Sequence, residues 1–399
     1  MKKIGIVTMF YKNINYGGVL QAFALCKFLN KNGYDAEQIR FVTSHSKKEG
    51  FFSAAKRMLS LGIDYVFHTA VKKISALKKG GTVVKSEITA EQKNIYSNEK
   101  KMRKEAFEKF ADKFVPSSDK VHYADTICYA GEHYDCFITG SDQVWNFRSY
   151  NPIYFLKFAQ KDKIKLSYAA SFSMDNLLNW QKRALKNHLS DFKAVSVREK
   201  QDLRFLEKIK VEQKEYVLDP TLLLEKEDWD EICESRLVDE RYVFCYFLGE
   251  NVKEREIAKR FAKEKGFTLV TISHAGGGMR PVDFDFGDTQ FGAASPNQFI
   301  SLIKYADYVF TDSFHAIVFS KIYNRQYFIF NRNSKKSMTS RIKCITALFG
   351  TEERYCDSEI RENYEYVCSL EDISYISENN ELADLKRSSV KFLLDNLGA

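Results

Sequence analysis

Residues 2–33 read KKIGIVTMFYKNINYGGVLQAFALCKFLNKNG and join three local patterns. A short apolar run typical of a buried strand comes first, and a polar loop with paired glycines follows it. Apolar residues at helical spacing then continue to Gly33. The next segment, DAEQIRFV over residues 35–42, is typical of a second strand. A strand, a helix and another strand in this order predict a βαβ unit, which builds a parallel sheet.

The same alternation continues along the chain with one interruption. In the first half, strands are predicted at 136–140, 165–172, 194–199 and 215–224, with helices at 177–192 and 200–209. The polar stretch EKEDWDEICESRLVDER, residues 225–241, breaks this rhythm. The second half then predicts strands at 241–249, 267–273, 307–312 and 326–330, and helices at 252–265, at 296–306 and from about His315.

Chain length also favours two domains, because 399 residues exceed what one hydrophobic core usually organises. The interruption predicts a first domain over 1–230 and a second over 231–375. The last segment, 376–399, contains the amphipathic pattern LADLKRSSVKFLLDNL and is expected to form a helix that packs back on the first domain. The predicted fold class is therefore α/β, with mostly parallel sheets covered on both faces.

The positive charge is concentrated in one insertion. The formal net charge is +8, and residues 47–113 hold sixteen Lys and Arg against eight Asp and Glu, an excess equal to the whole surplus. Residues 51–80 place apolar side chains near one helical face with lysines on its flanks, which fits either an ordinary packed helix or an interfacial helix on anionic lipid. No nucleic-acid-binding motif accompanies the charge, so no nucleic-acid partner is expected.

Two further patterns concern location and metals. MKKIGIVTMF passes directly into YKNINYGG, without the apolar core and cleavage site of a signal peptide, and no apolar run is long enough to span a membrane. These features predict a cytoplasmic protein, with residues 51–80 as the candidate for peripheral contact with the inner face of the membrane. The eight cysteines form no C-x-x-C pair, so reduced thiols are expected, and no metal site or cofactor.

Polar clusters follow several predicted strands of the first domain, at the edge where open parallel sheets bind ligands. NINYGG, residues 13–18, fits either a plain turn or an anion-binding loop. In GSDQVW, residues 140–145, a hydroxyl, a carboxylate, an amide and an aromatic ring suit a sugar, although Asp142 also suits a cap with Trp145 in the core. Arg198 ends an otherwise apolar strand, where a guanidinium either pairs with a carboxylate or binds an anionic substrate.

A fourth cluster, TDSFH over residues 311–315, follows the strand YVF of the second domain. Asp312 and Ser313 both suit the N-cap of the next helix, but a cap does not account for His315. A histidine at a strand's carboxyl end, close to the positive end of a helix, is suited to general acid and base catalysis. A structural role for His315 is the alternative.

Taken together, these stretches resemble the polysaccharide pyruvyl transferase family. The resemblance rests on motifs in family order over nearly the whole chain outside the basic insertion: IGIVTMFYKNINYGGVLQAFAL, FITGSDQVWN, SYAASFS, VSVREK, VLDPTLLL, YADYVFTDSFHAIVFS and SRIKCITALFG, the last at 340–350. It implies two Rossmann-like domains that face a cleft, similar to GT-B glycosyltransferases, with the acceptor on the first domain and the donor on the second. The implied reaction moves the enolpyruvyl group of phosphoenolpyruvate onto two hydroxyls of one sugar as a cyclic ketal, in the synthesis of exopolysaccharide, capsule or another part of the cell envelope.

The resemblance also implies roles for individual residues. The family's histidine matches His315 and its V-R-E arginine matches Arg198, while several branches carry a second arginine at the position of Ser313. Ser313 and Phe314 are therefore placed with the donor, and Arg341 or Arg332 is the hypothesised substitute for the second arginine. Asp142 is expected to be catalytic together with His315 and to be the foremost contact to the acceptor. The other expected contacts, all to a free or lipid-linked sugar acceptor, are Asn15, Tyr16, Gly17, Gln21, Ser141, Gln143 and Trp145.

Two other functions fit the same pattern. A nucleotide-sugar glycosyltransferase shares the architecture, but HAGGGMRP, residues 274–281, offers glycines and Arg280 without a convincing acidic partner for a ribose. A non-catalytic relative of the family is the other alternative, because the arginine expected at position 313 is missing.

Overall fold

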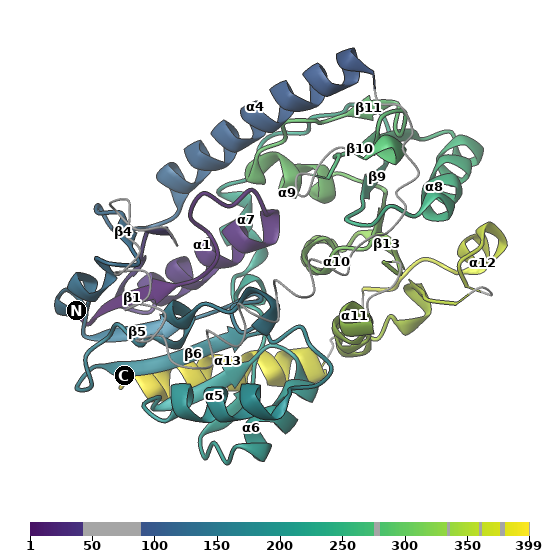
Figure 1. Cartoon of the computed structure of the whole chain (residues 1–399). Helices are drawn as coiled ribbons and strands as arrows, with labels where there is room; N and C mark the ends of the chain where they lie inside the picture. Colours follow the sequence, from purple (N-terminus) through teal and green to yellow (C-terminus); the bar gives the residue numbers. More distant parts are fainter. Residues whose placement is uncertain (43–88, 275–279, 333–335, 359–360, 376–379, 399) are drawn as a thin grey trace.

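The computed structural model of the chain describes residues 1–42, 89–274, 280–332, 336–358, 361–375 and 380–398. These residues form two six-stranded sheets, each with helices packed against it, and a separate pair of short strands (Figure 1). Every strand pair in the two large sheets is parallel. The predicted α/β class with two Rossmann-like domains is confirmed.

The first sheet has the strand order β2-β1-β5-β6-β7-β8. Its strands are β1 (Lys3–Val7), β2 (Asp35–Gln38), β5 (Cys136–Thr139), β6 (Ile164–Ala170), β7 (Ala194–Val197) and β8 (Lys214–Tyr216). The helices of this half are α1 (Tyr16–Lys31), α5 (Asn179–Leu189) and α6 (Leu203–Lys208). Because β1 pairs with β2 on one side and with β5 on the other, the order reverses beside β1, and such a reversal opens a crevice at the carboxyl ends of the strands.

The second sheet has the order β11-β10-β9-β12-β13-β14, the Rossmann order 3-2-1-4-5-6. Its strands are β9 (Tyr242–Tyr246), β10 (Thr268–Thr271), β11 (Thr289–Gln290), β12 (Tyr308–Thr311), β13 (Gln326–Phe330) and β14 (Tyr355–Cys356). The helices are α8 (Val252–Lys265), α9 (Pro296–Lys304), α10 (Phe314–Ile322), α11 (Lys336–Phe349) and α12 (Tyr364–Ser369). The reversal of this sheet lies between β9 and β12. The short 3-10 helices of both halves are Ile127–Glu132, Phe147–Ser149, Pro152–Phe155, Lys200–Asp202, Pro220–Leu222, Pro281–Asp283 and Glu352–Arg354.

Two predicted strands are shorter than expected. The strand predicted over 35–42 leaves the large sheet after Gln38, and β3 (Phe41–Val42) pairs instead with β4 (His122–Tyr123). The strand predicted over 215–224 ends at Tyr216. Beyond it, the Asp219 side chain accepts a hydrogen bond from the amide of Thr221, and Pro220 has no amide hydrogen for a neighbouring strand. A 3-10 turn therefore forms in place of the strand.

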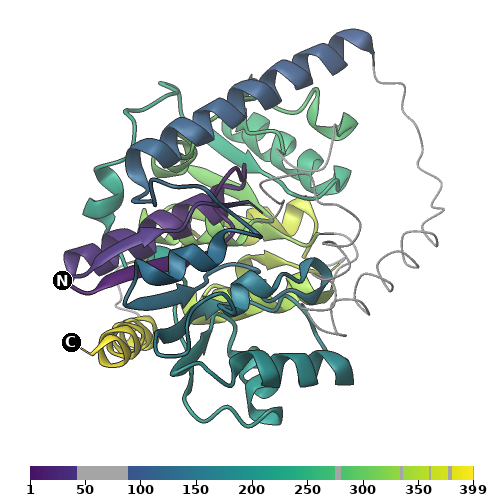
Figure 2. The same ribbon diagram turned by 60° about the vertical axis from the view of Figure 1, so that its left-hand side comes forward.

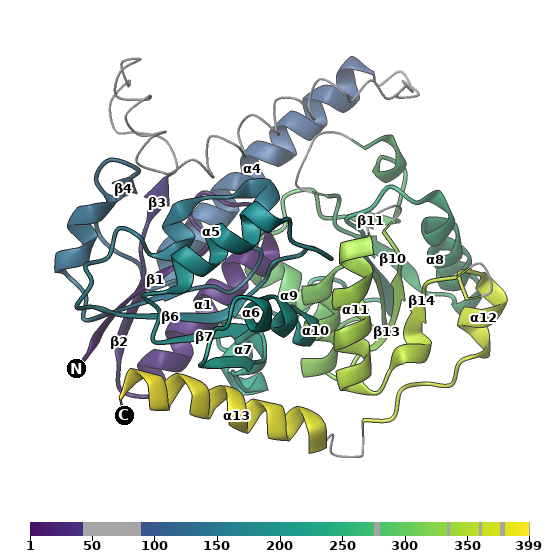
Figure 3. The same cartoon turned by 60° about the horizontal axis from the view of Figure 1, so that its bottom comes forward.

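Three helices connect the two halves. Helix α4 (Ala90–Phe114) runs diagonally from the first half across the second (Figure 2). Helix α7 (Lys226–Asp230) lies in the polar stretch between the two sheets, where the domain boundary was predicted. The carboxyl-terminal helix α13 (Asn380–Leu397) returns to the first half (Figure 3). There the Ser389 hydroxyl accepts a hydrogen bond from the Leu218 amide at 2.9 Å.

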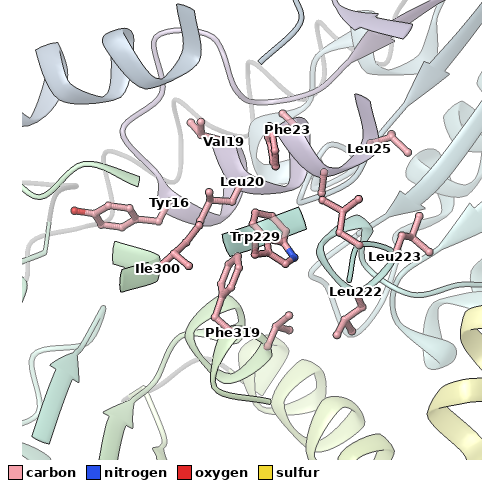
Figure 4. Close-up of a cluster of buried hydrophobic side chains, with 14 of the residues drawn as sticks. Tyr16, Val19, Leu20, Phe23, Leu25, Leu222, Leu223, Trp229, Ile300 and Phe319 are labelled. Atoms are coloured by element: carbon pink, nitrogen blue, oxygen red, sulfur yellow. The ribbon is translucent and has the colours of Figure 1, made fainter. Parts of the chain in front are cut away.

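An apolar cluster holds the halves together (Figure 4). Trp229 is fully buried; its ring centre lies 5.5 Å from that of Phe23 on α1 and 4.8 Å from that of Phe319 on α10. Tyr16 at the start of α1 stacks on Phe299 of α9 at 4.4 Å. Each such aromatic ring buries a large apolar area, so this contact has the character of a domain core and keeps α1 and α10 together.

The hypothesised interfacial helix over 51–80 lies outside the described residues, as does most of the basic insertion. In the part of the chain that the structure describes, no helix combines the length and the apolar character needed to cross a bilayer.

Candidate active site

The site lies where the reversal points of the two sheets meet. Gly17 follows β1, Asp142 follows β5, and His315 follows β12 in the first turn of α10. The His315 ring packs directly on Gly17: a Cβ atom at residue 17 would lie 1.9 Å from the imidazole Nδ1. Glycine at this position therefore allows a residue of the second half to enter the carboxyl edge of the first sheet.

Asp219 lies between His315 and Arg198, and sequence reasoning missed it. Its Oδ2 accepts hydrogen bonds from Arg198 Nη1 at 2.9 Å and from the Ser141 hydroxyl at 3.0 Å, and it lies 3.8 Å from His315 Nε2. The distance to His315 suits electrostatic attraction but is too long for a hydrogen bond. Burial alone would raise the pKa of Asp219, but His315 and Arg198 outweigh burial and hold that pKa well below its ordinary value. The carboxylate therefore stays ionised and faces the imidazole.

Arg198 is buried among three carboxylates. Besides Asp219, its Nε donates to Glu199 Oε1 at 3.1 Å, and its Nη2 lies 3.7 Å from Asp142 Oδ1. Burial would lower the pKa of Arg198, but these carboxylates outweigh burial and raise it. The Phe314 ring covers the guanidinium at 4.7 Å. Nη2 is buried and has no hydrogen-bond partner among the described residues, so it is the guanidinium atom best placed for a ligand.

Arg341 of α11 lines the same pocket as Arg198, Asp219 and Phe314. Its side chain is buried, and burial together with the charge of Arg198 lowers the pKa of Arg341 to about 10. Two guanidinium groups thus repel one another across the pocket, and an anion between them would relieve the repulsion. The pocket holds about 10 Å³, close to the roughly 10–15 Å³ that a single water molecule needs, so a ligand larger than water enters only after the surrounding side chains move apart.

Ser313 and Arg332, which were also predicted to bind the donor, do not line the pocket of Arg198 and Arg341. Asp312 does not cap α10: its carboxylate accepts hydrogen bonds from the amides of Leu248 and Gly249 after β9, both at 2.6 Å. Ser313 occupies the N-cap position, but its side chain makes no capping hydrogen bond. Arg332 pairs with Asp312, with 3.1 Å between Nε and Oδ2. Asp312 therefore joins the ends of β9 and β12 and holds Arg332 beside the site.

Two aromatic side chains that were predicted to contact the acceptor are buried in the protein core. Trp145 is 1% exposed, stacks on Phe155 with ring centres 5.7 Å apart and donates through Nε1 to the carbonyl oxygen of Tyr154. Tyr16 is also 1% exposed, and its hydroxyl donates to the carbonyl oxygen of Ala294. A role as a platform for a sugar does not fit either position, because neither ring presents a face to solvent.

Among the polar residues predicted to contact the acceptor, Gln21 and Ser141 are buried, whereas Asn15 and Gln143 are more accessible. Gln21 is fully buried; its Nε2 donates to Thr8 and its Oε1 accepts from the amide of Ser141. Gln21 and Ser141 therefore hold the turn after β5 in place. Asn15 caps α1 through the amide of Gly18 and is exposed, and Gln143 is half-buried. Of the predicted acceptor residues, Asn15 and Gln143 are the ones that an acceptor could reach.

Asp202 is buried close to Glu199, the carboxylate that pairs with Arg198, and it should make the stability of the protein depend on pH. Burial and the neighbouring Glu199 raise the pKa of Asp202 to about 9. The unfolded chain releases this proton near about pH 3.9 while the folded protein keeps it to a higher pH, so the free energy of unfolding should fall as pH rises from about 4 toward 9.

We expect Asp202→Asn to remove this slope, because the amide keeps a donor and an acceptor without a charge. Urea unfolding of both proteins near pH 5 and near pH 9 measures the difference. An equal pH dependence in both proteins would show that Asp202 is not the group responsible.

No group of three or more His, Cys, Asp or Glu side chains in the described segments is arranged to hold a metal ion. The eight cysteines are all free thiols.

Comparisons with known proteins describe the fold and the family. Solved structures similar to this chain include UDP-GlcNAc 2-epimerase from Neisseria meningitidis bound to UDP-GlcNAc, at 11% identity, 99% coverage of this chain, 100% of the other and a TM-score of 0.46. The glycosyltransferase SnogD from Streptomyces nogalater is similar at 9% identity, 99% coverage of both chains and a TM-score of 0.47. The S. aureus MnaA-UDP co-structure is similar at 12% identity, 92% and 86% coverage and a TM-score of 0.49.

No curated protein matches the sequence significantly. A family model described as polysaccharide pyruvyl transferase matches residues 15–334, which include Gly17, Asp142, Arg198, Asp219 and His315. The chain therefore belongs to the polysaccharide pyruvyl transferase family.

Proposed function

We propose that this protein transfers the enolpyruvyl group of phosphoenolpyruvate to two hydroxyls of one sugar in a surface polysaccharide precursor and forms a pyruvate ketal. Membership of a transferase family supports the reaction class. The single observation that carries the proposal is the pocket shared by Arg198, Asp219, Phe314 and Arg341, with His315 Nε2 beside it at 3.8 Å from Asp219 Oδ2. This arrangement combines cations for an anionic donor with a group that can move protons.

Phosphoenolpyruvate suits the two arginines because it carries a carboxylate and a phosphate. Arg341 contributes a positive charge in a buried setting, and Arg198 offers Nη2. Charge-assisted hydrogen bonds from guanidinium groups are stronger than neutral ones and fix the orientation of planar anions. Arg341 thus takes the role of the missing arginine at position 313, while Arg332 stays paired with Asp312 at the edge of the site.

The proposed reaction needs one proton in and two protons out. A proton added to the methylene carbon of phosphoenolpyruvate leaves positive charge on C2, and one sugar hydroxyl attacks C2 and loses its proton. The bond between C2 and the phosphate oxygen then breaks, and the second hydroxyl attacks C2 and loses its own proton. The products are the ketal and inorganic phosphate, which carries the remaining proton.

His315 is the group that we assign to these proton transfers. Its Nε2 is buried, has no hydrogen-bond partner among the described residues and faces the ionised Asp219. An imidazole placed this way beside the donor pocket can pass protons to and from the reacting atoms. Asp142 lies on the far side of Arg198 and balances its charge; its direct catalytic role remains a prediction.

The acceptor is proposed to approach over Asn15 and Gln143. We also propose a cytoplasmic site of action on a lipid-linked precursor, at the inner face of the membrane. The motivation is the basic composition of residues 47–113, and most of that segment lies outside the described residues.

The test is phosphate release from phosphoenolpyruvate with a panel of free and lipid-linked sugars, together with thermal unfolding. A donor at about 100 times its dissociation constant stabilises the folded protein by about 2.7 kcal/mol. We expect phosphoenolpyruvate to raise the melting temperature of the wild type, and we expect Arg341→Gln to abolish this shift because it removes one of the two buried cations.

Arg260→Gln is the matched control, since that arginine is 54% exposed on α8 and should leave the shift intact. Stabilisation by nucleoside diphosphates but not by phosphoenolpyruvate would replace the proposal with a nucleotide-sugar glycosyltransferase.

A further inference from the structure

A second pocket lies at the carboxyl edge of the second sheet, between α4 and described residues that follow β10, which include Ser273, His274 and Arg280. Its volume is about 270 Å³, close to the lower end of ligand sites, which start near 300 Å³. Helix α4 contributes one face, including Gln92, Tyr96 and Glu99, which follow helical spacing. His274 and Arg280 are on the opposite wall.

The wall formed by α4 is held in place. Arg103 is 3% exposed; its Nε donates to the carbonyl oxygen of Gly292 and its Nη1 to that of Ser273, both at 2.8 Å. One turn earlier, Glu99 packs so closely on Gly292 that a Cβ atom there would lie 2.0 Å from the carboxylate. The α4 wall of the pocket is therefore fixed, because this long helix is bound to the strand ends of the second half.

Two polar atoms in this pocket lack hydrogen bonds. The Tyr96 hydroxyl and His274 Nδ1 are both buried without a hydrogen-bond partner among the described residues. Burial and nearby arginines, Arg280 first, lower the pKa of His274 to about 3, so the imidazole is neutral at pH 7. Because buried polar groups are nearly always hydrogen-bonded, these atoms indicate a ligand or water that supplies the missing partners.

The charged groups that line the pocket are largely paired within the protein. Asp283 pairs with Arg255, with 2.6 Å between Oδ1 and Nη2. Arg280 donates to the carbonyl oxygen of Leu248 at 2.6 Å and lies 3.4 Å from Glu250. A charged ligand would find little unbalanced charge to bind here. A neutral molecule rich in hydroxyls would satisfy the phenol and the imidazole and could pack against the Tyr96 ring.

The pocket is also at a suitable distance from His315. Strand β9 separates β10 from β12, and neighbouring strands are about 4.8 Å apart, so the end of β10 is roughly 10 Å from the end of β12. Arg332 acts electrostatically on both His274 and Arg341, so the two sites share one charged neighbour. This separation exceeds one sugar ring, so a ligand that reaches both sites has more than one.

We propose that the pocket lined by Tyr96, Glu99 and His274 is a distal sugar subsite, which binds a neutral sugar unit of the acceptor other than the unit that receives the pyruvyl group. This inference rests on the proposed function. It makes the acceptor an oligosaccharide and makes the length of the glycan a determinant of specificity.

The experiment is binding of labelled full-length protein to an array of neutral mono- to tetrasaccharides of glucose, galactose and N-acetylhexosamines, without phosphoenolpyruvate. We expect at least one oligosaccharide to bind about tenfold more tightly than its constituent monosaccharides, since one added hydrogen bond with its packing contributes about this much. Tyr96→Phe, which removes only the hydroxyl, and His274→Ala should each lower that preference several-fold. Tyr129→Phe is the matched control because Tyr129 is 62% exposed.

Equal binding of mono- and oligosaccharides, no binding of any oligosaccharide, or a preference unchanged by both variants would overturn the subsite. The thermal shift with phosphoenolpyruvate, measured on the same samples, separates this result from failure of the proposed function. A donor shift without length preference removes only the subsite. A length preference without a donor shift removes the proposed donor and keeps the sugar pocket.

Discussion

Replacing His315 with alanine is expected to lower acceptor-dependent release of phosphate by about 10²–10⁴-fold, the usual contribution of a positioned general acid or base. The reason is the position of its imidazole, which lies 3.8 Å from the ionised Asp219 beside the pocket of the two arginines. The steady-state rate with phosphoenolpyruvate and a sugar acceptor measures the effect. Donor binding, followed by thermal shift, should survive the change because the arginines remain.

The control is His133→Ala, which removes an exposed histidine of the first half and should leave the rate unchanged. A His315→Ala protein that keeps full activity would assign the proton transfers to another group. If His315→Ala lost both its activity and the rise in melting temperature with phosphoenolpyruvate, His315 would have a role in donor binding in place of proton transfer.

The second large effect is expected on stability, from Asp219→Ala. Asp219 is 1% exposed and accepts hydrogen bonds from Arg198, Ser141 and Thr221. Removing one partner from a buried ion pair typically costs about 3–5 kcal/mol, because the remaining charge keeps its desolvation penalty without compensation. We therefore expect the free energy of unfolding, measured in urea at pH 7, to fall by about this amount.

The effect should also depend on pH. Since the folded-state pKa of Asp219 is depressed, its stabilisation is present above the unfolded-state pKa of about 3.9 and is lost as pH falls below that value. The difference in the free energy of unfolding between the wild type and Asp219→Ala should therefore become smaller at acidic pH. Asp112→Ala is the control: this carboxylate is 68% exposed, and such surface pairs contribute about 0–1 kcal/mol. Equal effects of the two substitutions would mean that Asp219 does not hold the site together.

The sequence by itself determined the two-domain α/β fold, because apolar periodicity is a local property. Helix α8 runs from Val252 to Lys265 as predicted, and it ends where Gly266 adopts the left-handed conformation that favours glycine. The strand that runs into TDSFH and the helix that begins at Phe314 were also predicted from the sequence. The candidate residues Arg198 and His315 could be named because each is polar at the end of a buried strand, where α/β sheets bind ligands.

Only the tertiary structure decided what these residues contact. Asp219 lies within the strand predicted over 215–224, which ends at Tyr216 in the structure, and nothing local distinguishes a turn-forming aspartate from one that joins Arg198 to His315. Asp312 was predicted to cap α10, but in the structure it accepts hydrogen bonds from two amides after the neighbouring strand β9. Trp145 was predicted either to contact a sugar or to lie in the core, and it lies in the core. Gly17 makes room for a histidine from the other domain. Such roles depend on the distances between segments far apart in the chain, and local sequence patterns carry no information about those distances.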